Sequence, residues 1–233
     1  GQMLHGEVTH GGLKRVYAEK VNGDYQGAVF RFTQGLEAGI NRVAWAPDGN
    51  TLYVGGVGNP GNWSHNGKAW YGLQKLTFNG KQAFEMLKVS ARSNGMELEF
   101  TQPLELGRGI TAAEYQVQQW YYLPTSSYGG DKKDLQDLKI ASVNISKDRK
   151  KVFLELEGMK PGHVVYIRIA EPFSSAANQS LWSTEAWYTL NAIPANKPGF
   201  RNVVKPQAAN KLSADERKAG WKLLFDGKTT KGW

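Results

Sequence analysis

Aromatic side chains beside amides are the strongest chemical signal in this sequence of 233 residues. Trp63, Trp70 and Tyr71 lie in or next to a glycine-rich loop that also contains Asn59 and Asn62. Exposed rings stack on the apolar faces of sugars, while neighbouring amides hydrogen-bond the sugar hydroxyls. The loop is therefore a candidate carbohydrate-binding site. Three further tryptophans are expected to pack inside the fold, namely Trp120, Trp182 and Trp187.

Histidines and acids give only a weak metal candidate. His5 and His10 bracket Glu7 and Thr9, which makes residues 5–10 the densest group of possible ligands. If the segment is a strand, side chains five positions apart point to opposite faces, so the two histidines would not share an ion. Asp residues at 131, 134 and 137 recur every three positions, unlike the alternate spacing of a calcium loop, and are expected to form a solvated turn.

No pattern in the sequence indicates catalysis. It lacks a Gly-x-Ser-x-Gly elbow, an ordered Ser/His/Asp set and a phosphate-binding glycine loop before a helix. The absence of cysteine excludes disulfides, thiolate metal sites and thiol chemistry. We therefore expect no catalytic residue, and no cofactor, in this chain.

The net charge of +8 first suggests nucleic acid as a partner. However, residues 195–233 carry nine Lys and Arg against three Asp and Glu, so most of the excess lies in a tail rich in Pro, Asn and Ala. A nucleic-acid site is instead a basic patch on a folded face. We expect neither nucleic-acid binding nor, because no apolar run reaches 18 residues, a transmembrane segment.

The elements that must position these residues are β-strands. In residues 1–89, Asn22-Gly23 separates two β-rich runs and predicts a hairpin, and Pro47-Asp48-Gly49 predicts another. Strands that end in glycines after such turns are typical of β-propeller blades. The segment has strands for one or two blades, whereas a closed propeller needs four. We therefore expect a partial propeller-like sheet.

Residues 90–191 show a different pattern. Short runs such as Met96–Phe100 and Val152–Leu156 alternate polar and apolar residues and recur about every ten positions. This predicts an immunoglobulin-like β-sandwich, and hence an all-β chain of antiparallel strands. Residues 192–233 are expected to form a proline-containing linker, a one-turn helix capped by Ser213 and Glu216, and the start of a further domain.

Two family resemblances add to this interpretation. The last 22 residues, with Gly220-Trp221, Leu224-Phe225-Asp226-Gly227 and Gly232-Trp233, resemble the opening of the 3-keto-disaccharide hydrolase family. That resemblance implies the first strand of a truncated jelly-roll hydrolase domain, whose catalytic acids would all follow Trp233. It therefore assigns no catalytic residue to this chain.

The second resemblance covers residues 1–191. Segments such as His5–Gly12, Leu52–Gly56 and Leu181–Leu190 resemble the last blades of glucose/sorbosone-dehydrogenase-like propellers and the immunoglobulin-like domain that follows them. Such proteins are secreted, multidomain and of Bacteroidetes type. The resemblance implies a secreted, periplasmic or cell-surface location. It also implies pyrroloquinoline quinone and calcium in the parent propeller.

Together these features favour a non-catalytic structural module whose partners are other domains of a secreted, carbohydrate-active protein. The alternative is a carbohydrate-binding module that grips glycans with the aromatic residues of the 59–71 loop. A third possibility, an enzyme in its own right, would require a deep pocket with two close carboxylates or a bound metal.

Overall fold

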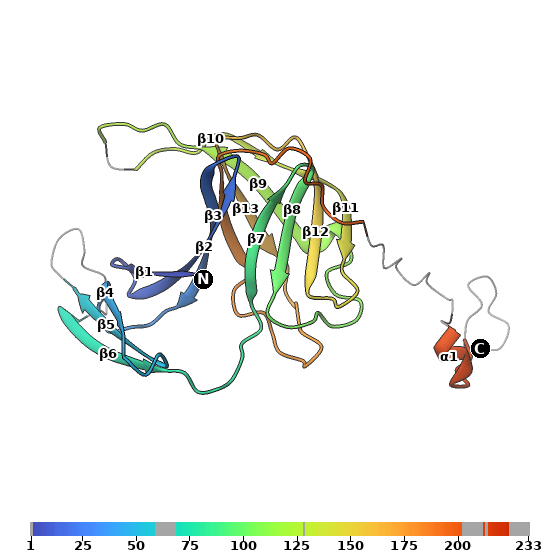
Figure 1. The fold of residues 1–233 in the computed structure, drawn as a ribbon, viewed down its shortest axis with the longest axis horizontal. Helices are drawn as coiled ribbons and strands as arrows, with labels where there is room; N and C mark the ends of the chain where they lie inside the picture. Colours follow the sequence, from blue (N-terminus) through green and yellow to red (C-terminus); the bar gives the residue numbers. More distant parts are fainter. Residues whose placement is uncertain (1, 59–68, 128, 202–211, 213, 224–233) are drawn as a thin grey trace.

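The structure, a computed structural model, describes residues 2–58, 69–127, 129–201, 212 and 214–223. Its regular secondary structure consists almost entirely of antiparallel strands, arranged in three sheets (Figure 1). The expected all-β class is confirmed. No helix in these ranges is long and apolar enough to cross a membrane.

The largest sheet has seven strands. In spatial order they are β1 (Met3–Glu7), β2 (Gly12–Val21), β3 (Asp24–Thr33), β14 (Glu185–Leu190), β13 (His163–Ile169), β9 (Tyr115–Tyr121) and β10 (Lys133–Asp137). The second sheet has four strands, in the order β11 (Lys139–Ile145), β12 (Lys151–Glu157), β8 (Gly95–Phe100) and β7 (Met86–Arg92).

The third sheet has three strands in sequence order, β4 (Gly39–Trp45), β5 (Thr51–Val57) and β6 (Tyr71–Thr77). Two short helices complete the described elements, the 3-10 helix η1 (Ala112–Glu114) and α1 (Ala214–Lys218). Helix α1 lies where the capping pattern predicted it, although Ser213 itself is outside the described residues.

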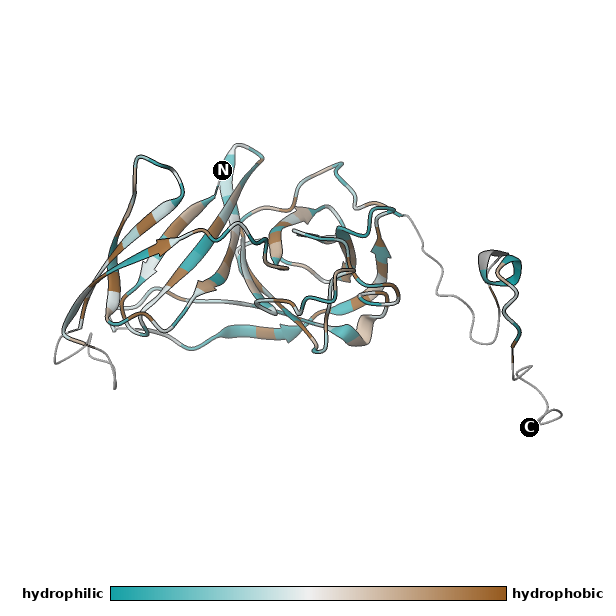
Figure 2. Cartoon of the chain, turned by 90° about the horizontal axis from the view of Figure 1, so that it is seen from below, coloured by the Kyte–Doolittle hydropathy of each residue, from teal (hydrophilic) through white to brown (hydrophobic). Residues whose placement is uncertain are grey.

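The seven- and four-stranded sheets pack face to face as a sandwich. Apolar and polar residues alternate along their strands (Figure 2), and the inward rows meet in one core that includes Phe30, Val117, Ile167, Leu98 and Leu154. We letter strands β7 to β14 as A, B, C, C′, D, E, F and G in chain order. The four-stranded sheet then has the order A-B-E-D (β7-β8-β12-β11), and its partner has the order C′-C-F-G (β10-β9-β13-β14), as in an immunoglobulin-like sandwich. The strand alternation in residues 90–191 therefore predicted this part of the fold correctly.

Strands β2 and β3 belong to the sandwich, although they come from the segment expected to resemble a propeller. β3 pairs with β14 through Ala186↔Phe30 and the three residue pairs that follow, and β2 pairs with β3. The two strands thereby cover an edge of the sandwich that would otherwise be unpaired. Strand β7 also spans the expected boundary between residues 1–89 and 90–191, so that boundary lies inside a strand of the sandwich.

The β2–β3 hairpin is closed by the turn that the sequence indicated. Asn22 and Gly23 both have positive φ values, 51° and 99°, as a two-residue hairpin turn requires. Asp48 likewise closes the β4–β5 turn by accepting hydrogen bonds from the backbone N–H groups of Asn50 and Thr51. Both turns are local features, which explains why the sequence indicates them.

Strands β4–β6 form the small sheet, which packs on the free end of the β1–β3 hairpins. Its inward residues Ile40, Leu52 and Val54 join Leu13 and Leu36 in a second, smaller hydrophobic cluster. That this sheet derives from a propeller blade stays a prediction from sequence.

The first ten residues of the expected linker pack on the sandwich. Gly199 donates its backbone N–H to Asn94, and Arg201 forms an ion pair with Glu155 at 3.0 Å. Phe200 contacts the ring of buried Phe153. Residues 192–201 are therefore a strap across the four-stranded sheet (Figure 1), and the linker expectation is wrong for this stretch.

Candidate functional site

A junction of side chains joins β2 to β7, the edge strand of the four-stranded sheet. The Arg15 guanidinium lies 2.9 Å from the Glu85 carboxylate and donates a hydrogen bond of 2.7 Å to the Leu87 carbonyl. It also lies over the Phe30 ring, 4.6 Å from the centroid. An edge strand leaves backbone groups unpaired, and here an arginine nearly buried between the sheets satisfies them.

Further along the same edge, Glu19 connects three strands. Its carboxylate accepts the backbone N–H of Ala91 at 2.7 Å and the hydroxyl of Tyr188 at 2.6 Å. Buried Gln26 donates to the Tyr188 oxygen and to the Ala192 carbonyl. Burial, together with the bond to Glu19, raises the pKa of Tyr188 well above its ordinary value. The junction therefore continues from β2 through β7 and β14 to the strap.

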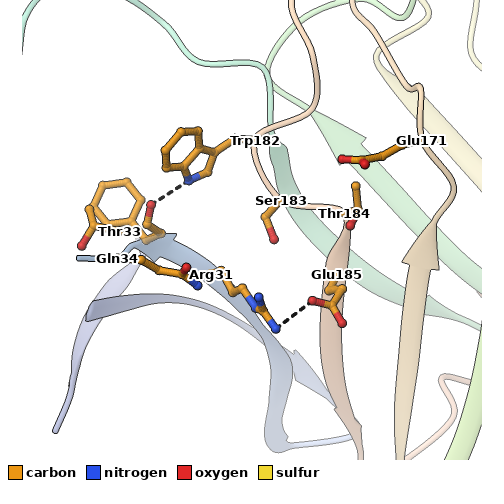
Figure 3. Close-up of a pocket in the computed structure, with 9 residues that line it drawn as sticks. Arg31, Thr33, Gln34, Glu171, Trp182, Ser183, Thr184 and Glu185 are labelled. Carbon is orange, nitrogen blue, oxygen red and sulfur yellow. Dashed lines mark hydrogen bonds and ion pairs between the residues drawn. The ribbon is translucent and has the colours of Figure 1, made fainter. Parts of the chain in front are cut away.

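A cleft of about 440 Å³ opens where β3 ends and β14 begins (Figure 3). Its walls come from residues 31–34 at the end of β3, residues 182–185 at the start of β14, and Glu171. Residues 33–34 and 182–184 are at or beyond the strand ends, where side chains no longer alternate strictly between two faces. This local irregularity lets an aromatic ring and several polar groups line one cavity.

An ion pair lines the cleft. Arg31 Nη2 lies 3.0 Å from Glu185 Oε2, and the Tyr166 hydroxyl donates to the same carboxylate at 2.6 Å. Burial and this bond raise the pKa of Tyr166 to about 12. The pair is only partly buried and remains open to the cleft. Glu185 is thus a fixed hydrogen-bond acceptor whose charge Arg31 balances.

Trp182 forms one wall, and the expectation that it packs inside the fold is wrong. Its side chain is 60% exposed, although the indole N–H donates to the Phe32 carbonyl at 2.7 Å and its backbone N–H donates to Phe84. The adjacent Leu181 carries the packing instead. In the sequence, the only indication that Trp182 is exposed is the polar run Ser183-Thr184-Glu185 that follows it. For Trp120, which is buried, the expectation of packing holds.

The remaining groups of the cleft are hydrogen-bonding side chains of both polarities: Thr33, Gln34, Glu171, Ser183 and Thr184 (Figure 3). Together with the ion pair they offer donors and acceptors without a large net charge. This combination can hold a polar, uncharged ligand against the Trp182 ring. Sequence reasoning missed the cleft because its residues lie some 150 positions apart.

The aromatic loop predicted from the sequence is described only in part. Asn59, Asn62 and Trp63 lie outside the described residues. Trp70 and Tyr71, at the start of β6, are 67% and 81% exposed, so both rings are accessible. They lie on the small sheet and do not line the Trp182 cleft.

The histidines of the weak metal candidate are not brought together with further ligands. His5 lies on β1, opposite Lys14 of β2, whereas His10 lies in the turn that follows, 3.4 Å from Glu7. Burial raises the pKa of Glu7, but its carboxylate accepts hydrogen bonds from the backbone N–H groups of His10 and Thr9. These bonds help to lower the pKa below its ordinary value. Among the described residues, no group of three His, Asp or Glu side chains could hold a metal ion.

Comparison of the chain with family models, curated proteins and solved structures found no match.

Proposed function

We propose that this chain is a non-catalytic structural module that holds the small sheet rigidly against the immunoglobulin-like sandwich. In the secreted, carbohydrate-active protein that the sequence resembles, the module would fix the geometry between the domains on either side. Pyrroloquinoline quinone and calcium would belong to the parent propeller. None of the described residues suggests a role in binding them.

The observation that carries this proposal is the pairing of β3 with β14. Through it, one antiparallel sheet runs without interruption from β1 to β10. The junction reinforces that pairing, because Arg15 and Glu19 of β2 bind the edge of the other sheet. The small sheet is a separate sheet that packs on β2 of this framework through the cluster of Leu13, Ile40 and Leu52. Strands β1–β3 thereby connect it to the sandwich as one body, which is what a spacer requires.

Spin labels test this rigidity directly, because the chain has no cysteine of its own. Labels on Lys75→Cys, in the small sheet, and Lys147→Cys, in the sandwich, should give one narrow distance distribution by electron-electron resonance. Adding Arg15→Met and Tyr188→Phe should broaden that distribution. A broad distribution in the chain without these two changes would refute a rigid spacer.

A second measurement addresses catalysis. The chain should show no turnover of a 3-keto-disaccharide or of ordinary disaccharides above a heat-denatured control. In the cleft, Glu185 already pairs with Arg31 and Tyr166, so it is poorly suited to act as a general acid. Turnover that disappears in Glu185→Gln would overturn the proposal.

The alternative function, glycan binding by the 59–71 loop, is favoured by the exposure of Trp70 and Tyr71. It predicts that Trp70→Ala weakens binding to a glycan array, while the spin-label distances stay unchanged. Loss of glycan binding on Trp70→Ala alone would favour this alternative.

A further inference from the structure

The Trp182 cleft is part of a longer groove on the outer face of the seven-stranded sheet. One adjoining cleft, of about 490 Å³, shares Glu171 and Thr184 with it. Another, of about 450 Å³, shares Arg31 and Gln34 with it. The three clefts share lining residues and are therefore neighbours in a series across the strands.

A row of cross-strand neighbours lies along this groove. Lys14 of β2 lies opposite Arg31 of β3, and Arg31 pairs with Glu185 of β14. Glu185 in turn lies opposite Arg168 of β13, which lies opposite Gln116 of β9. Directly opposed residues share a face of a sheet, and the adjacent row, with Phe30 and Ile167, is buried. The row therefore faces outward along its whole length.

The charges of the groove balance. Three basic side chains (Lys14, Arg31, Arg168) meet three acidic ones (Glu7, Glu171, Glu185). A phosphate or a polyanion would have to approach these three carboxylates, so balanced charge favours an uncharged ligand. Hydroxyl groups, which both donate and accept, suit such mixed side chains best.

The Trp182 ring supplies the apolar contact that a sugar needs. Its indole N–H is fixed on the Phe32 carbonyl, so the ring is held in place while most of its surface stays exposed. A ring fixed before binding loses little entropy when a ligand stacks on it. Backbone groups inside the sheet are already paired between strands, so a peptide could not add as a further strand here.

We propose that this groove binds an uncharged oligosaccharide, with one pyranose ring stacked on Trp182 and its hydroxyls bonded by Gln34, Glu171 and the Arg31–Glu185 pair. The neighbouring sugar units would lie over the row from Lys14 to Gln116. The ligand thus crosses the strands, and its length exceeds one sugar. Trp70 and Tyr71 do not line this groove, and the proposal does not depend on the spacer function.

Affinity electrophoresis in gels that contain soluble polysaccharides tests the proposal. The neutral probes are barley β-glucan, arabinoxylan, galactomannan and starch, and polygalacturonate is the charged control. At least one neutral polysaccharide should retard the chain. Trp182→Ala should weaken that retardation at least tenfold, and Gln34→Ala at least threefold. Because Gln34 is exposed, its variant keeps the test valid if Trp182→Ala impairs folding.

The matched control is Trp45→Ala, which removes a ring of similar exposure, 61%, from the small sheet. It should leave the retardation unchanged, as should Trp70→Ala. Retardation by none of the neutral polysaccharides, or by polygalacturonate alone, would overturn the proposal. The proposal would also be overturned if Trp45→Ala or Trp70→Ala abolished the retardation while Trp182→Ala and Gln34→Ala retained it in full.

Chain length provides the last comparison. A hexasaccharide of the retained polysaccharide should bind at least tenfold more tightly than the disaccharide in calorimetry. Arg168→Ala should reduce the affinity for the hexasaccharide but not for the disaccharide. Equal affinities for the two lengths would refute the extended groove.

Discussion

The guanidinium of Arg15 lies 2.9 Å from the carboxylate of Glu85, and this ion pair joins the second strand of the chain to the edge of the opposite sheet. Seventy positions separate the two residues in sequence. Both side chains are largely shielded from solvent, so the pair lies within the fold, in contrast to the exposed pairs elsewhere on the surface. The attachment of β2 to the edge of the four-stranded sheet depends on it.

Arg15→Met should therefore destabilise the protein strongly. The substitution keeps most of the apolar stem but leaves the Glu85 carboxylate without its cation, while the Leu87 carbonyl keeps only its hydrogen bond from Gln2. Breaking such a largely buried pair costs about 3 kcal/mol. Urea denaturation measures the change. The control Arg201→Met removes an exposed ion pair with Glu155 and should cost about 1 kcal/mol or less. Equal losses in both variants would contradict the role of the junction.

The strap should depend on the absence of a side chain at Gly199. A Cβ atom placed there would lie 2.2 Å from ring atoms of Phe153, which is too close for either group. Gly199→Ala should destabilise the protein by about 1–3 kcal/mol, as overpacking does. It should also speed tryptic cleavage after Arg201. Gly130→Ala, where the nearest atom is 3.8 Å away, is the control and should cause neither effect.

Alkaline pH should unfold the protein through its tyrosines. Burial raises the pKa of Tyr115, Tyr166 and Tyr188, in the case of Tyr166 to about 12. Below pH 10 both the folded and the unfolded chain keep these protons, so the stability is fully present. Above it only the unfolded chain releases them, and the free energy of unfolding falls.

Urea denaturation at a series of pH values up to about 12 measures this fall in the free energy of unfolding. The fall should begin near pH 10, the ordinary pKa of tyrosine. Tyr166→Phe should flatten the decline between pH 10 and 12, because one of the shifted groups is gone. Tyr25→Phe, which removes an exposed ring hydroxyl, serves as the matched control. A curve for Tyr166→Phe that coincides with that of the unmodified chain would be inconsistent with this account.

Asp134 should titrate at an unusually low pH. Hydrogen bonds from Lys160 at 2.7 Å and His163 at 3.1 Å lower the pKa of its carboxyl group. Since the folded pKa lies below the unfolded one, its contribution to stability is present above the unfolded value. That contribution is lost as the pH falls through the folded pKa.

Carbon NMR of the carboxyl group checks this titration. Lys160→Met should move the pKa of Asp134 back toward its ordinary value. The control is Asp148, whose pKa is lowered by a separate set of partners, chiefly Ser146, and should not move. A pKa of Asp134 that is unaffected by Lys160→Met would contradict the role of Lys160 as the main cause of the lowered value.

The alternation of the strands, the Asn22-Gly23 and Asp48 turns and the all-β class follow from local sequence patterns. Each depends on neighbours within a few positions: alternation sets the two faces of a strand, and the Asn22-Gly23 pair adopts the positive φ values of its turn. The buried position of Trp120 also followed from the general behaviour of tryptophan in β-proteins. The seven-stranded sheet, by contrast, was not foreseen.

The pairing of the strands, in contrast, is set by contacts between distant segments. The alternation of polar and apolar residues indicates which face of a strand is buried, but it does not indicate which strand pairs with its edge. The sequence therefore does not reveal that β3 pairs with β14. The same limit hid the cleft, because Arg31 and Glu185 come from those two strands. Trp182 is exposed because Leu181 fills the core beside it, and the strap forms because Gly199 fits against Phe153. These are contacts between distant segments, and their geometry exists only after the sheets have assembled.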